Sequence, residues 1–216
     1  MNSPKSRMMD LMRGMAMQEN NWLVCNHLSH SPEDIEAIRN FAVVHPKTGE
    51  GLERYLKEDA LMDEDEGFMR TYLVRHRQTG DLVGYFSLKA GLVALNERRM
   101  PDSSIAFDTV PGVELANFAI NKKFLEKYHQ RRLGGIVFHR LVVPLVLKFA
   151  ESLGIYLLYI FALPQPKLIE TYHDYGFQRL SDKAEGLLHK RLKPSYDESC
   201  IFMFQTLGRL RELMSC

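Results

Sequence analysis

Apolar and polar positions along the chain alternate in short blocks, and the period within each block predicts a strand or a helix. Apolar runs predict strands over residues 21–28, 69–74, 82–88, 113–120, 155–162, 177–180 and 199–207. Apolar positions at helical spacing predict helices over residues 32–42, 51–62, 134–152 and 167–175, with a last helical turn at 210–214. Strands and helices that alternate in this way predict one α/β domain with a mixed sheet.

Turn and capping residues refine these boundaries. Ser31 is a candidate N-cap with Pro32 at the first helical position, so a helix is expected to begin there. The polar segment Gln78–Asp81 predicts a hairpin turn between two strands. Residues 96–111 are polar and include two prolines, which predicts a long loop, and long loops are often functional. Pro144 lies within a predicted helix and is expected to kink it.

Composition narrows the class of protein. The chain has 216 residues, 45% of them hydrophobic and 25% charged, as in ordinary globular proteins. We expect a methionine-rich arm or helix over residues 1–20 and one domain over residues 21–216. A net charge of +1 predicts no general attraction to nucleic acid or membranes, and no run reaches the ~18 unbroken apolar residues of a membrane span. Three distant cysteines without a CxxC pair argue against disulfides and metal sites and favour the cytoplasm.

The most informative stretch of the chain is an apolar strand, a glycine turn and an apolar helix. Val113–Ile120 is the expected strand, His129–Gly135 is the turn, and the helix continues from Ile136. A helix that begins at glycine exposes free backbone N–H groups and the positive end of its dipole. The turn is therefore a candidate site for a phosphate or pyrophosphate group.

The order of these elements resembles that of the GNAT superfamily of N-acetyltransferases, over roughly residues 22–207. Tyr172, Gly176 and Phe177 match the family pattern N-x-x-A-x-x-x-Y-x-x-x-G-F, in which Gln165 and Leu168 replace the asparagine and the alanine. The resemblance implies an α/β fold: a single GNAT-like domain whose mixed, mostly antiparallel sheet is flanked by helices and has splayed central strands. It also implies acetyl-CoA as the acyl donor.

The family's turn, Q/R-x-x-G-x-G/A, wraps the pyrophosphate of acetyl-CoA, and it fits this sequence in three registers. The first begins at His129, with Arg132 at the first glycine and Gly134 at the last. The second runs from Gln130 to Gly135, and the third from Arg131 to Ile136. By this resemblance the backbone of Phe118 to Ile120 contacts the acetyl carbonyl and the pantetheine arm. The cofactor-binding residues that it implies are Phe118, Ala119, Ile120, Gln130, Arg131, Arg132, Leu133, Gly134, Gly135 and Gln165.

Acetyl transfer needs a neutral amine, a stabilised thioester oxygen and a proton for the leaving thiolate. The resemblance makes Tyr172 the candidate proton donor, because a phenol of pKa about 10 is protonated at neutral pH. Glu114 is the candidate base, since a carboxylate within an apolar strand is costly to bury and such groups are often functional. Two alternatives stay open: Asn117 positions a water for this step, or Glu114 is a structural residue in water or in a salt bridge.

Three functions follow from these observations. The first is acetyl transfer from acetyl-CoA to a primary amine of a small molecule or a protein. The second is acetylation of aminoacyl-tRNA, because residues 51–56, 70–74 and 84–88 resemble a GNAT subgroup that includes such bacterial toxins. Basic pairs such as Arg131–Arg132 would then contact nucleic acid. The third is a non-catalytic interaction module. Apart from these functions, the apolar segment 201–204 is a candidate homodimer contact.

Overall fold

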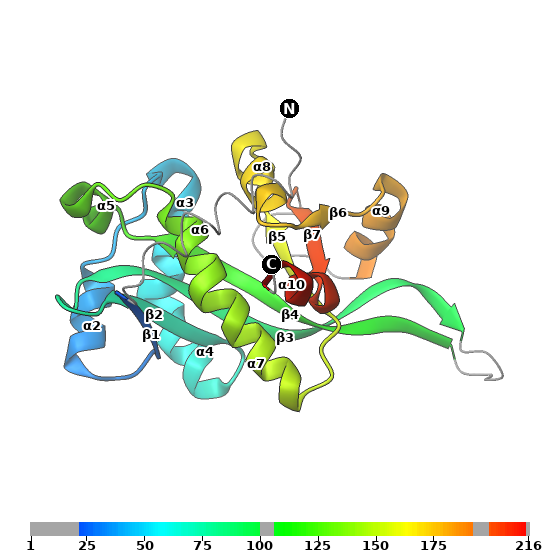
Figure 1. The fold of residues 1–216 in the computed structure, drawn as a ribbon, viewed down its shortest axis with the longest axis horizontal. Helices are drawn as coiled ribbons and strands as arrows, with labels where there is room; N and C mark the ends of the chain where they lie inside the picture. Colours follow the sequence, from blue (N-terminus) through cyan, green and yellow to red (C-terminus); the bar gives the residue numbers. More distant parts are fainter. Residues whose placement is uncertain (1–21, 100–105, 192–198, 215–216) are drawn as a thin grey trace. The chain divides into compact units, whose positions relative to one another are not determined.

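The computed structural model describes residues 22–99, 106–191 and 199–214 (Figure 1). The arm expected over residues 1–20 lies outside the described residues. The strands in chain order are β1 (Leu23–His27), β2 (Arg70–His76), β3 (Leu82–Arg99), β4 (Ala106–Ile120), β5 (Leu157–Ala162), β6 (Gln178–Arg179) and β7 (Ile201–Thr206). The helices are α2 (Pro32–Arg39), α3 (Pro46–Arg54), η1 (Tyr55–Asp59), α4 (Ala60–Glu66), α5 (Lys122–Tyr128), α6 (Leu133–Val137), η2 (Phe138–Val142), α7 (Val143–Ser152), α8 (Pro166–Asp174), α9 (Asp182–Arg191) and α10 (Leu207–Met214).

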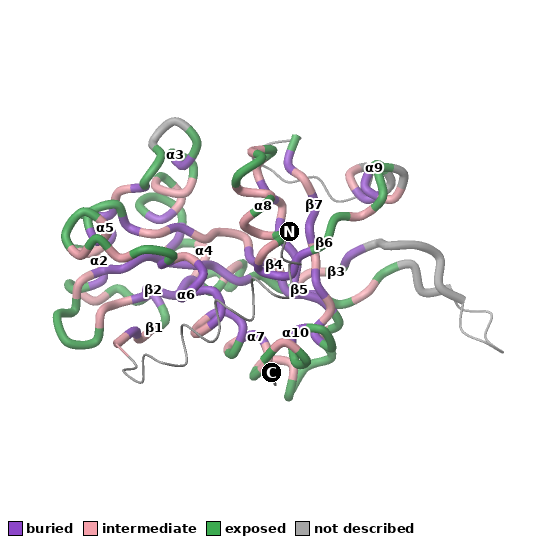
Figure 2. The backbone as a smooth tube through the Cα atoms, turned by 45° about the horizontal axis from the view of Figure 1, so that its top comes forward, coloured by how far each residue is buried: buried purple, intermediate pink, exposed green. Residues whose placement is uncertain are grey.

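The strands form a seven-stranded sheet in the order β1-β2-β3-β4-β5-β7-β6. The pairs β1–β2, β2–β3, β5–β7 and β6–β7 are antiparallel, and β4 runs parallel to β5. Residues of the strands are largely buried, whereas the outer turns of the helices are exposed (Figure 2). The predicted fold class, a mixed and mostly antiparallel sheet flanked by helices, is confirmed.

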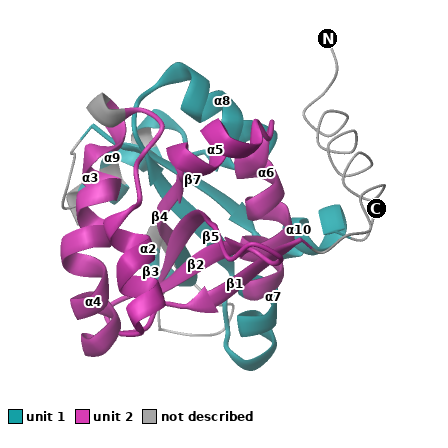
Figure 3. Cartoon of the chain, turned by 90° about the vertical axis from the view of Figure 1, so that its left-hand side faces the viewer, with its two compact units in different colours: residues 1–16, 90–114, 146–216 teal, residues 17–89, 115–145 magenta. Residues whose placement is uncertain are grey.

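The chain forms two compact units, each made of separate chain segments (Figure 3). Unit 2 comprises the described parts of residues 17–89 and 115–145, and unit 1 those of residues 90–114 and 146–216. Strands β3 and β4 contribute to both units, since the boundaries fall within them. Each unit has its own core and its own candidate site residues.

The parallel ladder between β4 and β5 is short. It joins Gly112–Glu114 to Leu157–Tyr159, and these three pairs are its full extent within the described residues. β5 continues to Ala162 and β4 continues to Ile120. The two central strands therefore separate after Glu114, as the predicted fold requires.

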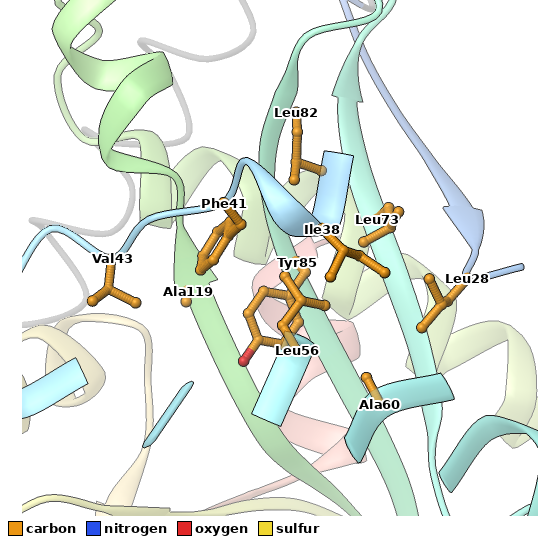
Figure 4. Packing of buried hydrophobic residues seen from close by; sticks show 10 residues of the cluster. All are labelled: Leu28, Ile38, Phe41, Val43, Leu56, Ala60, Leu73, Leu82, Tyr85 and Ala119. Carbon is orange, nitrogen blue, oxygen red and sulfur yellow. The ribbon is translucent and has the colours of Figure 1, made fainter. Parts of the chain in front are cut away.

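The core of unit 2 lies between the sheet and the helical segments α2, η1 and α4 (Figure 4). Tyr85 is fully buried there, and its hydroxyl donates to the Leu52 carbonyl at 2.6 Å. Ser31 caps α2 as predicted, because its side chain accepts from the Asp34 amide. The core residues drawn in the figure are Leu28, Ile38, Phe41, Val43, Leu56, Ala60, Leu73, Leu82, Tyr85 and Ala119.

The core of unit 1 is built around aromatic residues of β5 and β7. Tyr159 and Phe202 lie with ring centroids 5.6 Å apart, and Leu188 of α9 packs into the same cluster. The amphipathic pattern of α9 is weak, and the sequence did not predict this helix. Glu185 of α9 accepts from the Phe202 amide at 3.0 Å, so a polar contact also ties the helix to β7.

One sequence expectation about the middle of the chain is wrong, and one helix there was not predicted. The loop expected over residues 96–111 is largely strand, because β3 extends to Arg99 and β4 begins at Ala106; residues 100–105 lie outside the described residues. Backbone pairing holds strands together whatever their side chains, so polarity alone is a poor sign of a loop. The segment after Ile120 also contains an unpredicted helix, α5, which Asn121 caps by accepting from the Lys123 amide.

The long helix formed by α6, η2 and α7 contains one widened turn just before Pro144. The Val143 amide bonds the Phe138 carbonyl, five residues back, rather than the usual carbonyl four residues back. The irregularity expected at the proline thus takes the form of a π-type turn. By length and composition Leu133–Ser152 would suffice to cross a membrane, and half of its apolar window is buried inside the protein.

Candidate functional site

The predicted turn lies between α5 and α6 of unit 2, and its backbone is left-handed at two positions. His129 ends α5 with φ 51°, and Arg132 precedes α6 with φ 55°. In the part of the chain that the structure describes, these are the two non-glycine residues with positive φ. A left-handed backbone costs most residues about 1–2 kcal/mol and favours glycine. The turn therefore holds backbone strain at both ends.

The N-terminus of α6 presents free backbone amides. No side chain caps this end, and the Ile136 amide bonds the Arg132 carbonyl at 3.2 Å. Within the described residues, the amides of Leu133, Gly134 and Gly135 have no acceptor. Amides at the start of a helix bind anions, because they donate hydrogen bonds at the positive end of the helix dipole.

The end of α5 is anchored immediately before the turn. The Tyr128 hydroxyl and the Lys127 ammonium donate to Asp81 of unit 2 at 2.5 Å and 2.7 Å. These two hydrogen bonds lower the pKa of Asp81 to about 2. The Phe124 ring also lies 4.4 Å from the Tyr128 ring. These contacts fix the helix end from which the turn begins.

The turn and α5 carry an exposed group of cations. Lys122 pairs with Glu126 at 3.7 Å, and Lys127 pairs with Asp81. Among the described residues no salt-bridge partner is found for Lys123, Arg131 and Arg132. This surface is suited to phosphate groups, which guanidinium and ammonium groups bind by charge-assisted hydrogen bonds. Its five members are Lys122, Lys123, Lys127, Arg131 and Arg132.

The strand residues expected to contact the acyl donor lie in the same unit as the turn. Ala119 is buried in the unit 2 core, while Phe118 and Ile120 are half-buried. The Ala119 carbonyl oxygen lies where a side chain on Gly84 would be, so the adjacent strand needs glycine at that place. The structure thus joins Phe118–Ile120 to the turn through α5, as the sequence order required.

Glu114 lies at the last pair of the β4–β5 ladder in unit 1, opposite Tyr159. Burial raises the pKa of Tyr159, and the hydrogen-bonded Glu114 carboxylate raises it further. Glu114 is half-buried, so an acid in this strand does have a polar partner. This contact supports a structural reading of Glu114, and its role as a base stays a prediction.

Tyr172 lies in α8 of unit 1, where aromatic rings surround it. Its ring centroid is 6.0 Å from that of Tyr175 and 5.7 Å from that of Phe177. Burial raises the pKa of Tyr172 to about 12, so its hydroxyl is protonated at neutral pH. Gln165 is the N-cap of α8, and its side chain makes no capping bond. Gly176 has φ 97°, which explains the glycine after this helix.

Sequence reasoning missed a polar cluster on the sheet of unit 2. Thr71 and Ser87 are register partners on β2 and β3, both fully buried, with their hydroxyls 2.9 Å apart. Tyr55 of η1, Met69 and Asn117 of β4 lie next to them. Thr71 and Ser87 occupy inward positions of otherwise apolar strands. This pattern of hydroxyl side chains is the feature of the sequence that could have predicted the cluster.

The residues expected to act together thus fall into two sets. Unit 2 contains Phe118–Ile120 and the turn, whereas unit 1 contains Glu114, Gln165 and Tyr172. No group of three histidine, cysteine, aspartate or glutamate side chains in the described ranges is placed to hold a metal ion.

No family model matches this sequence. Solved structures of bacterial toxins have the same fold. A tyrosine-to-phenylalanine mutant of the AtaT toxin, bound to the C-terminus of the antitoxin AtaR and acetyl-CoA, superposes with a TM-score of 0.61 at 17% identity, covering 91% of this chain and 100% of that one. A similar mutant of KacT gives 0.62 at 22% identity, covering 89% and 99%. AtaT complexed with acetyl-methionyl-tRNAfMet gives 0.60 at 19% identity, covering 89% and 99%. At these identities the likeness establishes the fold.

Proposed function

We propose that this chain is an acetyl-CoA-dependent N-acetyltransferase. The observation that carries the proposal is the turn before α6, where three free amides and the cations Arg131 and Arg132 surround one helix end. This arrangement fits the pyrophosphate of acetyl-CoA, which bears negative charge and many acceptor oxygens. The similar AtaT structure contains acetyl-CoA, which supports the same acyl donor here.

The backbone of Arg132 favours the first of the three registers for the turn. That register places Arg132 at the motif's first glycine, and its φ of 55° is one that glycine adopts easily. Leu133 and Gly134, the residues at this place in the other registers, belong to α6. Arg132 therefore has a backbone conformation that suits glycine, and it adds a guanidinium beside the expected phosphates.

The proposed reaction replaces the carbon–sulfur bond of the thioester with a carbon–nitrogen bond. The amine nitrogen attacks the thioester carbonyl carbon, the carbon–sulfur bond breaks, and the thiolate leaves. Tyr172 donates its phenolic proton to that thiolate as the bond breaks, and the proton that the amine loses restores the phenol. The attacking amine loses a proton to a base or a water, for which Glu114 and an Asn117-positioned water remain candidates. Amides of Phe118–Ile120 are the candidate donors to the acetyl oxygen.

We further propose that the acceptor is the α-amino group of an aminoacyl-tRNA. AtaT, a protein of this fold, was solved with acetyl-methionyl-tRNAfMet, the product of such a reaction. An α-amino group has a pKa of about 7.7–8.0, so it is partly neutral at pH 7, whereas a lysine ammonium is not. The exposed Lys123, which has no salt bridge among the described residues, adds to the positive surface that a tRNA backbone would contact.

Thermal unfolding with and without acetyl-CoA tests the cofactor. Ligand at about 100 times its Kd adds about 2.7 kcal/mol, which corresponds to a rise of about 5–10 °C for a chain of this length. ADP and dephospho-CoA are the controls. Transfer of labelled acetyl groups to methionyl-tRNA, against uncharged tRNA, then tests the acceptor. Absence of any rise at millimolar acetyl-CoA would overturn the acetyltransferase proposal.

A further inference from the structure

The hairpin between β2 and β3, residues 77–81, holds the C-terminal end of α5 in unit 2. Asp81 accepts from the Tyr128 hydroxyl at 2.5 Å and from the Lys127 ammonium at 2.7 Å. Both donors are the last residues of α5, and the Tyr128 hydroxyl also donates to the Thr79 hydroxyl at 3.3 Å. One carboxylate of the hairpin thus joins it to a helix that follows β4 in the chain.

Stacked rings make a second contact with α5. The His76 ring, at the end of β2, lies 5.6 Å from the Tyr128 ring with their planes 12° apart. The Thr79 amide donates to His76 Nδ1 at 3.3 Å, which orients this ring. The Trp22 ring stacks on Phe124 of α5, with ring centroids 6.3 Å apart and planes 9° apart. Hydrogen bonds and rings therefore hold the same helix.

The residue that follows this helix has an unfavourable backbone conformation. His129 has a left-handed φ of 51°, and its amide bonds the Leu125 carbonyl at 2.9 Å. A strained conformation of this kind persists only where the surrounding structure enforces it. Residues 130–132 then lead to the N-terminus of α6. The contacts of the α5 end thus determine the direction in which the chain enters the turn.

We propose that Asp81 is a positioning residue for acyl-donor binding: by holding the end of α5, it keeps the backbone of His129 in the conformation that directs the turn toward the pyrophosphate. The inference rests on the proposed acetyl-CoA-dependent function and adds a residue that supports its binding site. Asp81 acts through the helix end, because its carboxylate already accepts from two donors and its negative charge would repel a phosphate.

The charge of Asp81 gives the two possible effects of its removal opposite signs. The phosphates of acetyl-CoA are negative, so removal of a nearby carboxylate strengthens binding if charge alone matters. Loss of position weakens binding instead. Glu126→Gln is the matched control for charge, because Glu126 is an exposed carboxylate of α5 that pairs with Lys122 of the same helix at 3.7 Å.

Calorimetric titration of the full-length chain measures the Kd for acetyl-CoA. We expect Asp81→Ala to raise this Kd about 10-fold and Tyr128→Phe about 5-fold, while Glu126→Gln leaves it unchanged or lowers it. The double variant Asp81→Ala with Tyr128→Phe should bind no more weakly than Asp81→Ala, because both changes remove the same contact. Fluorescence of Trp22, the single tryptophan, reports independently that α5 has moved.

Two fragments of acetyl-CoA distinguish a displaced turn from general damage to the fold. ADP contains the pyrophosphate, and S-acetylpantetheine does not. Competition against acetyl-CoA gives the affinity of each fragment for the wild type and the variants. Asp81→Ala should weaken ADP by the same factor as acetyl-CoA and leave S-acetylpantetheine unchanged.

The outcomes also separate this inference from the proposed function. Unchanged or tighter binding of acetyl-CoA in both Asp81→Ala and Tyr128→Phe would overturn the positioning role and leave the proposed function standing. Equal weakening of ADP and S-acetylpantetheine would overturn it as well, since a displaced turn affects the pyrophosphate alone. A wild-type chain that binds no acetyl-CoA would overturn the proposed function and, with it, this inference.

Discussion

The hydroxyl of Tyr159 occupies the space that any side chain at residue 91 would need, and residue 91 is glycine. Gly112, on the strand between them, makes similar room, since a side chain there would press against the Tyr159 ring. The tyrosine of β5 therefore lies across β4 and reaches β3. Its contact with Glu114 depends on this path, so two glycines in unit 1 position one candidate site residue.

We expect Gly91→Ala to destabilise the protein by about 1–3 kcal/mol, because the added methyl forces Tyr159 out of its place. Urea unfolding of the variant and the wild type measures this difference. Gly154→Ala is the matched control in the same unit, since nothing lies within 4 Å of a side chain added there. Equal loss of stability in both variants would contradict the role given to Tyr159.

His139 of η2 makes stability depend on pH in the acid range. Burial lowers the pKa of His139 from about 6.5 to about 4, so the folded state favours the neutral ring. The stabilisation is fully present above pH 6.5 and is lost as pH falls toward 4, by up to about 3 kcal/mol. Unfolding measured at pH 7, 5.5 and 4.5 should show this loss, and His139→Leu should reduce it. A loss of the same size in His139→Leu would contradict this assignment.

Arg132→Gly and Arg132→Ala together distinguish the effect of backbone strain in the turn from the effect of the Arg132 charge. Glycine removes the left-handed strain, so we expect stability to rise by about 0.5–1 kcal/mol. The same change removes a guanidinium, so the thermal shift produced by acetyl-CoA should become smaller. Arg132→Ala removes the charge and keeps the strain. A stability gain in the alanine variant equal to that in the glycine variant would show that the backbone is not strained.

Tyr172→Phe should lower kcat about 100-fold and leave the Kd for acetyl-CoA unchanged, because the phenol donates a proton only in the transfer step. Phenylalanine keeps the ring contacts with Tyr175 and Phe177. Single-turnover transfer and a binding titration measure the two quantities. An unchanged kcat would rule out Tyr172 as the proton donor.

We expect ionisation of Tyr72 to lower the stability of the protein at alkaline pH. Burial raises its pKa from 10 to about 12, so its protonated form is favoured in the fold. The stabilisation is present below pH 10 and is lost as pH rises through 12, by about 2–3 kcal/mol. Unfolding followed between pH 9 and 12 should show less decline for Tyr72→Phe than for the wild type. A steeper decline in the variant would contradict the assignment.

Local signals in the sequence were sufficient wherever a short segment determines its own structure. The Ser31 cap, the hairpin at residues 78–81 and the helix predicted over residues 134–152 follow from neighbouring residues, and the structure agrees to within one residue at the helix start. The sequence did not predict α9, because its amphipathic pattern is weak. Packing on β7 stabilises this helix. The sequence also did not predict how long β3 and β4 are, since the length of a strand depends on backbone pairing with its partner strand.

The candidate site was predictable only in part, for a similar reason. The turn is local, so its glycines and arginines could be read in order along the chain. The cluster of Tyr55, Met69 and Asn117 brings together residues from η1, the start of β2 and β4. Nothing in the sequence gives the register that places two donors on one sulfur. Long-range pairing alone creates that cluster.

The segmented make-up of the two units also sets the order in which they can form during synthesis. Unit 2 is built from residues 17–89 and 115–145. Its N-terminal segment therefore cannot complete its fold until strand β4 and the helices after it have been synthesised. Unit 1 in turn needs the C-terminal strand β7, whose partner β5 precedes it by some forty residues. Contacts between such distant segments slow folding, and nascent chains that end before β7 expose an unpaired side of β5. A pause in translation before β7 should therefore leave a chain that depends on chaperones until its last strand is released.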